Sequence, residues 1–92
     1  MSNLKISEFC QIMPTIFYSA GYRFFFYSYD LNEPPHIHVD RDNKLAKYWL
    51  EPISLAYNRK YNDHELNEIV RIIRENLEVI RERWNEHYNR KF

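Results

Sequence analysis

The sequence predicts a small α+β domain, in which an antiparallel sheet of about four strands packs on one long carboxy-terminal helix. Short runs rich in aromatic and β-branched residues, separated by turn residues, fill residues 13–55 and indicate strands. From residue 62 onward, apolar residues recur at alternating steps of four and three, which is the period of a helix. Strands that precede a helix, rather than alternate with helices, are typical of the α+β class.

The first two strands are expected on either side of Gly21. Met13–Tyr18 predicts a short strand after which Ser19-Ala20-Gly21 reverses the chain. Tyr22–Tyr29 is the strongest strand candidate and carries aromatic side chains on both of its faces. Because neither face suits full exposure to water, we expect the amino-terminal segment or another subunit to cover part of this strand.

The next two strands are expected as a hairpin. The loop Asp30–Pro35 leads into His36–Asp40, and Arg41–Lys44 supplies a turn before the strand-like run Leu45–Leu50. Pro34 and Pro35 within this loop favour extended backbone and direct the chain into the strand. The sequence therefore predicts antiparallel pairing of these two runs.

Beyond the hairpin, the strand pattern weakens. Pro52 ends the run, and Ile53–Leu55 is expected to resume it as a short edge strand, where a neighbouring proline is tolerated. Ala56–Lys60 is then expected to connect the sheet to the helix.

The helix is expected from Asn62 to about Asn89. Asn62 and Glu65 have the spacing of a capping box, and Tyr61 and Leu66 occupy the two positions of a hydrophobic staple. One apolar stripe continues along the helix and is expected to face the sheet; it consists of Leu66, Val70, Ile73, Leu77, Ile80 and Trp84.

Composition narrows the function classes. The 92 residues suffice for one domain near the lower limit of size, so oligomerisation is plausible, and the formal net charge of zero does not indicate a nucleic-acid partner. The single glycine argues against a glycine-rich phosphate loop. One cysteine, no signal-peptide pattern and no apolar run of membrane-spanning length predict a cytoplasmic protein without a membrane partner.

The segment Asn32–Val39 holds the candidate site. On an extended strand His36, His38 and Asp40 point to one face, and imidazoles two residues apart lie roughly 6 to 7 Å apart along the strand. These three side chains are the candidate ligands for zinc or another divalent metal, with Asp30 and His64 as more distant ones. No other cofactor is indicated.

Two other interpretations of the histidine pair remain open. Without a metal, one imidazole can take a proton and the other give one, as in cleavage of RNA or a similar ester, with Arg23 or Lys44 stabilising the anion. The alternative is structural: the rings bond to the backbone of the preceding loop and stack on Tyr27 or Tyr29. The histidines are thus candidate catalytic residues, and these two cations and two tyrosines are candidate binding residues.

A second group interleaves basic and aromatic residues: Tyr57, Arg59, Lys60 and Tyr61. Single-stranded nucleic-acid binders use such patterns. In a neutral domain, however, a few scattered cations more commonly belong to a solvated loop with packed tyrosine rings.

The chain resembles the small bacterial domain of unknown function 4160 family. The resemblance lies in Met13-Pro14-Thr15-Ile16, in the aromatic strand after Gly21, in Asn32-Glu33-Pro34-Pro35-His36-Ile37-His38-Val39, and in Glu82-Arg83-Trp84 of the helix. It covers residues 13–92 as a single domain, so residues 1–12 form an amino-terminal extension. The family has no established activity, and its genes often lie beside another small domain, as in toxin–antitoxin loci. The resemblance implies a bacterial intracellular protein with a protein partner.

Two functions follow as expectations. The first is a protein-interaction or regulatory module of a toxin–antitoxin-like pair, in which spare aromatic surface on Tyr22–Tyr29 serves a partner or a homodimer. The alternative is an enzyme, a small nuclease or metal-dependent hydrolase that uses His36 and His38.

Overall fold

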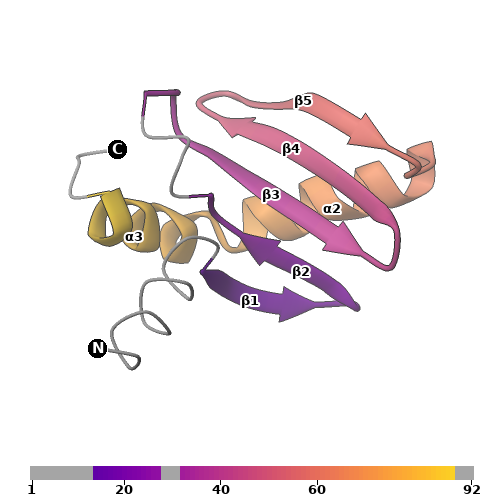
Figure 1. Ribbon diagram of the computed structural model, residues 1–92, viewed down its shortest axis with the longest axis horizontal. Coiled ribbons are helices and arrows are strands. Elements are labelled where there is room, and N and C mark those ends of the chain that lie inside the picture. The colour runs from indigo at the N-terminus through magenta and orange to yellow at the C-terminus, as the bar shows by residue number, and fades with distance from the viewer. Residues whose placement is uncertain (1–13, 28–31, 89–92) are drawn as a thin grey trace, which may run out of the picture.

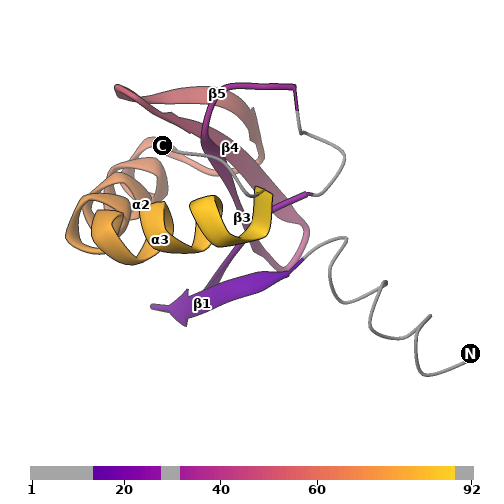
Figure 2. The ribbon, with the colours of Figure 1, turned by 90° about the vertical axis from the view of Figure 1, so that its left-hand side faces the viewer.

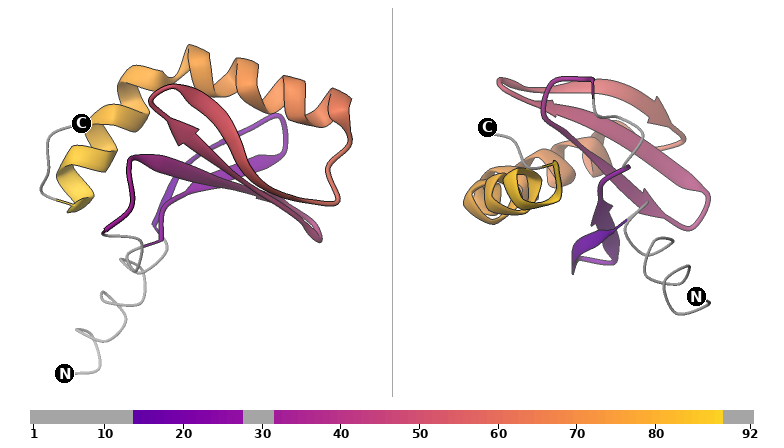
Figure 3. Two further views of the ribbon diagram at one scale, coloured as in Figure 1. Left: turned by 90° about the horizontal axis from the view of Figure 1, so that it is seen from above. Right: turned by 60° about the vertical axis from the view of Figure 1, so that its left-hand side comes forward.

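A computed structural model describes residues 14–27 and 32–88, which form one antiparallel sheet with two helices on one of its faces (Figure 1). The strands follow chain order across the sheet, so each pairs with the next. Seen from above, both helices lie on the same side of the sheet (Figure 3). The elements are β1 (Thr15–Ser19), β2 (Tyr22–Phe25), β3 (His36–Arg41), β4 (Lys44–Leu50), β5 (Ile53–Arg59), α2 (Asp63–Glu75) and α3 (Leu77–Tyr88).

The α+β class is confirmed, but the described residues form five strands rather than about four. The difference lies at β5, because residues 56–59 continue this strand instead of connecting to the helix. The β4–β5 register shifts between Lys47 and Tyr48, which pair with Tyr57 and Leu55, so Ala56 is an extra residue on β5. Such a bulge breaks the alternation that marks a continuing strand in a sequence.

The predicted hairpins are present. Gly21 has a φ of +83° in the turn between β1 and β2, a conformation that glycine adopts without strain. His36 to Arg41 of β3 pair one to one with Trp49 to Lys44 of β4, as expected. The aromatic strand, in contrast, ends at Phe25 rather than Tyr29, and Tyr29 lies outside the described residues.

The core lies between the helices and one face of the sheet. Ile37 and Val39, which alternate with the two histidines along β3, are fully buried on that face. The other buried apolar side chains of this core are Tyr22, Phe24, Phe26, Ala46, Tyr48, Leu50, Tyr61, Ile69, Ile72, Ile73, Ile80, Trp84 and Tyr88. Tyr22, Phe24 and Phe26 alternate along the chain, so one side of the aromatic segment is buried beneath the helices.

Two helices replace the single long helix that the apolar stripe predicted. Asn76 separates α2 from α3, with a φ of −117° and its side-chain Nδ2 donating to the carbonyl oxygen of Ile72 at 2.8 Å. A side chain that bonds the backbone in this way competes with the regular helical ladder. As a result α3 lies at the end of the sheet where β2 ends and β3 begins (Figure 2).

The start of α2 follows the sequence prediction. The backbone N–H of Glu65 donates to the Asn62 side chain at 2.8 Å, and the N–H of Asn62 donates to the Glu65 carboxylate at 3.0 Å. The capping box is therefore complete. Neither described helix combines the length and the apolar character needed to cross a membrane.

Candidate functional site

The histidine pair lies close to the start of β3, on the face opposite Ile37 and Val39 and at the end of the sheet that α3 reaches. His36 is fully buried and His38 is 7 % exposed, and their ring centroids lie 5.1 Å apart. The two rings therefore touch, as the spacing in the sequence predicted. Neither ring has a large solvent-exposed area.

Aromatic rings and loop backbone enclose His36. Its Nδ1 lies 2.8 Å from the carbonyl oxygen of Pro34, and since a carbonyl only accepts hydrogen bonds, Nδ1 carries the proton. Trp49 of β4 and Trp84 of α3 meet the ring edge to face, with centroids at 5.7 Å and 5.3 Å. His36 thus connects the sheet, the preceding loop and the last helix.

His38 lies among aromatic side chains of the segment that contains β2. Its ring stacks on Phe25 at 5.4 Å and meets the edge of Tyr27 at 4.7 Å. The predicted hydrogen bond from a histidine to the loop and the predicted contact with Tyr27 are both present. These are the contacts of the structural interpretation.

Asp40 follows on the same face but bonds to a neighbouring cation. Nη1 of Arg23 donates to its carboxylate at 3.2 Å, and the same guanidinium lies 4.2 Å above the ring of Phe25. Among the residues that the structure describes, no three His, Cys, Asp or Glu side chains are grouped as a metal site. His64 is exposed at the start of α2, and Asp30 lies outside the described residues.

Of the candidate binding residues, Arg23 and Tyr27 lie beside the histidines and Lys44 does not. Nζ of Lys44 donates to Glu65 at 2.7 Å, and Arg41 donates to the same carboxylate at 2.7 Å. The hydrogen bond from Lys44, followed by the capping hydrogen bond with Asn62, lowers the pKa of Glu65 to about 2. This cluster fastens the start of α2 to the β3–β4 hairpin.

The second basic and aromatic group does not form one surface. Tyr61 is buried, and its hydroxyl donates to the carbonyl oxygen of Val39. Tyr57, Arg59 and Lys60 are exposed along and just after β5. Burial of Tyr61 agrees with the interpretation in which the cations are solvated and the tyrosine rings pack against the protein.

The expectation of spare aromatic surface on the second strand is wrong for most of the described residues. Tyr22, Phe24, Phe25 and Phe26 are all buried, and Tyr27 is partly buried. Helices cover alternate residues, while Arg23 and His38 pack against Phe25 on the other face. The described part of this segment therefore leaves little apolar surface exposed.

Two of the four large exposed apolar side chains among the described residues lie on β5, at one edge of the sheet; the other two are Tyr18 of β1 and Val79 of α3. Leu55 is 45 % exposed and Tyr57 is 47 % exposed. Leu55 pairs with Tyr48 on the face toward the helices, and Tyr57 pairs with Lys47 on the opposite face. Sequence reasoning missed this surface, although the uncharged run from Ser54 to Asn58 was a signal for it.

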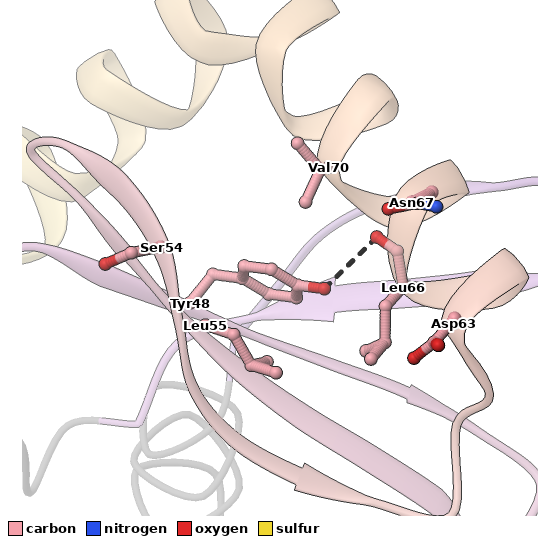
Figure 4. A pocket seen from close by; sticks show the side chains of 7 residues that line it. All are labelled: Tyr48, Ser54, Leu55, Asp63, Leu66, Asn67 and Val70. Carbon is pink, nitrogen blue, oxygen red and sulfur yellow. Dashed lines mark hydrogen bonds between the residues drawn. The ribbon is translucent and has the colours of Figure 1, made fainter.

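A groove of about 400 Å³ runs between β5 and α2 (Figure 4). Tyr48 forms its floor and donates from its hydroxyl to the carbonyl oxygen of Leu66 at 3.2 Å. Figure 4 shows Leu55 of the strand pointing toward Leu66 of the helix, with Val70 on the other side of the Tyr48 ring in this view. We call this hollow the β5–α2 groove; its lining is Tyr48, Ser54, Leu55, Asp63, Leu66, Asn67 and Val70.

These observations define a small two-layer α+β domain with a buried histidine pair and an open sheet edge. The chain belongs to the family described as a domain of unknown function, DUF4160, whose model matches residues 21–85. The match confirms the resemblance that the His36–His38 motif carried. Neither the curated proteins nor the solved structures gave a match to this chain.

Proposed function

We propose that this protein is an interaction module that binds a protein partner through β5 and the β5–α2 groove. The observation that carries the proposal is the exposure of Leu55 and Tyr57 on an edge strand beside an apolar groove. Exposed apolar side chains that adjoin a groove commonly mark protein-binding surfaces.

The groove suits an apolar side chain of the partner. Its walls are Leu55 on the strand and Leu66 and Val70 on the helix, while Asp63 and Asn67 supply a polar rim. An apolar core with a polar rim is the usual composition of a protein interface. The partner therefore presents an extended segment with at least one large apolar residue.

The toxin–antitoxin-like pair is the setting that we propose for this module. Its support is the family resemblance, because genes of this family often lie beside another small domain. The partner is then the protein encoded by the adjacent gene, and the module acts by binding it.

The enzymatic alternative, a nuclease or hydrolase centred on the histidine pair, has less support. His36 is fully buried, and its Nδ1 proton is used by the carbonyl oxygen of Pro34. A general acid or base must come within hydrogen-bonding distance of its substrate. Trp49 and Trp84 would have to move away from the His36 ring before a substrate could reach it.

Calorimetric titration of the purified protein with the product of the adjacent gene tests the proposal. We expect Leu55→Ser to weaken the complex by about tenfold or more, equivalent to at least ~1.4 kcal/mol of binding free energy. Tyr18→Ser is the matched control, since Tyr18 is a 70 % exposed apolar residue on β1, at the other edge of the sheet.

Circular dichroism and thermal melting confirm that both variants fold. An affinity that is unchanged by Leu55→Ser, or lowered equally by Tyr18→Ser, would contradict the assignment of this surface. Absence of any complex with the wild-type protein would contradict the proposed pairing.

A further inference from the structure

We propose that residues 1–13 of this chain pack on the sheet face that α2 and α3 leave free, which we call the outer face, and that they cover Phe25 and His38 there. Two cross-strand rows define the outer face: Tyr18, Arg23 and Asp40 form one, and Phe25, His38 and Lys47 form the other. The inference goes beyond the proposed function, because the β5–α2 groove lies on the opposite side of the sheet.

Two rings on the outer face are more deeply buried than an open sheet face explains. Phe25 is 2 % exposed, although it does not belong to the core beneath the helices. His38, which pairs with it across the strands, is 7 % exposed. Both described helices lie on the other side of the sheet (Figure 3), and a sheet face in contact with water usually carries polar side chains. A further layer of protein is therefore expected over these rings.

The described neighbours of the two rings shield their sides. The guanidinium of Arg23 packs on Phe25 at 4.2 Å, and His38 has Phe25 and Tyr27 beside it, with ring centroids at 5.4 Å and 4.7 Å. Side chains of a strand stand roughly perpendicular to the sheet, so neighbours flank a ring without closing the side that points away from the sheet. That outward side is the position that we assign to residues 1–13.

The path of the chain brings this segment to the two rings. The carbonyl oxygen of Pro14 accepts a hydrogen bond from the N–H of Phe26 at 3.2 Å, so the chain enters β1 beside the segment that contains Phe25. Thirteen residues precede Pro14 in the sequence, and even as a helix they would span about 20 Å. Three strand spacings, from β1 to β4, come to about 14 Å. The segment is therefore long enough to cross both rings.

The composition of residues 1–13 suits a buried position. The segment has two charged side chains, Lys5 and Glu8. Its large apolar side chains are Met1, Leu4, Ile6, Phe9, Ile12 and Met13. Apolar side chains that pack on Phe25 leave water, which stabilises the covered arrangement. Residues 28–31 and a second copy of the chain are the other candidate occupants of the outer face.

Cross-linking from Cys10 tests the placement in the full chain. Cys10 is the only cysteine, so one introduced cysteine defines one pair of thiols. Lys47→Cys places the second thiol on the outer face, in the row of Phe25 and His38, and Arg74→Cys places it at an exposed position on α2. With a short bismaleimide we expect the intramolecular link to form about tenfold or more faster in Lys47→Cys, because the effective concentration of the two thiols is higher there.

Controls separate this placement from the other occupants. Cys10→Ser should abolish the link in both backgrounds, and thermal melting checks that each variant folds. Equal rates of linking would overturn the inference, because a segment that does not lie on the outer face has no preference for Lys47→Cys, and residues 28–31 would then be the cover. Linked dimers in place of linked monomers would also overturn it, because they would identify a second copy as the occupant.

Discussion

His36 has a packing role that its sequence motif does not reveal. The ring contacts a loop carbonyl, a strand tryptophan and a helix tryptophan, and it is fully buried. Removing a buried ring leaves a cavity, and it leaves the group that was hydrogen-bonded to the ring without a partner. Its identity as histidine is explained by a need for both an aromatic ring and a hydrogen-bond donor.

We predict that His36→Ala lowers the free energy of unfolding by about 2 to 3 kcal/mol, from lost packing and the unpaired carbonyl of Pro34. Urea unfolding measures this change. His64→Ala, at an exposed position, is the control and should stay within about 0.5 kcal/mol of wild type. If His36→Ala kept wild-type stability but lost a cell-growth phenotype, the enzymatic alternative would gain support.

Glu65 shows how one side chain can make stability depend on pH. Glu65 is 8 % exposed, and its carboxylate accepts from Arg41, from Lys44 and from the backbone of Asn62. These contacts favour the ionised form and lower its pKa from 4.5 to about 2. A carboxyl whose pKa falls on folding stabilises the folded state at pH values above its unfolded pKa.

The stabilisation from Glu65 is therefore expected to be complete above about pH 5 and to be lost as the pH falls from 4.5 toward 2. Unfolding by urea at several pH values measures the slope. Glu65→Gln should be less stable than wild type at neutral pH and should show a shallower acid dependence. An identical slope in the variant would mean that other carboxyls account for the acid loss.

At the scale of elements, local signals decided where α2 begins, and contacts between strands decided where β5 ends. The capping box needs only Asn62 and Glu65, three residues apart, so a sequence displays it directly. The bulge at Ala56 exists only in relation to β4, because it is an offset between two strands.

We predict that Asn62→Ala destabilises the protein by about 1 kcal/mol, since it leaves the N–H of Glu65 without its capping acceptor. Thermal melting followed by circular dichroism measures the effect. Asn67→Ala, at an exposed position inside α2, removes the same side chain without removing a cap. Equal losses in the two variants would show that the cap contributes no more than an ordinary helix position.

For the whole molecule, the layer arrangement sets which surface remains for binding. The helices cover the face that holds Phe24, Ile37 and Tyr48, and the aromatic segment that looked exposed in the sequence is used for the core. A chain of 92 residues has few apolar side chains beyond those that its core requires. We place the proposed binding surface at Leu55 and Tyr57 because these exposed residues lie beside the β5–α2 groove.

The sequence by itself determined the α+β class, the strand pairing around residues 36–50, the helix start at Asn62 and the adjacency of the two histidines. Each depends on alternation, helical period or a short spacing, which are properties of neighbouring residues. The tertiary structure decided the length of β5, the break at Asn76 and the burial of His36 against Trp84. The length of β5 and the burial of His36 depend on contacts between residues far apart in the chain, because burial and register arise only when separate elements pack together. The break at Asn76 is local, since its side chain bonds to the carbonyl oxygen of Ile72, but the apolar period of the helix continues across it and conceals it in the sequence.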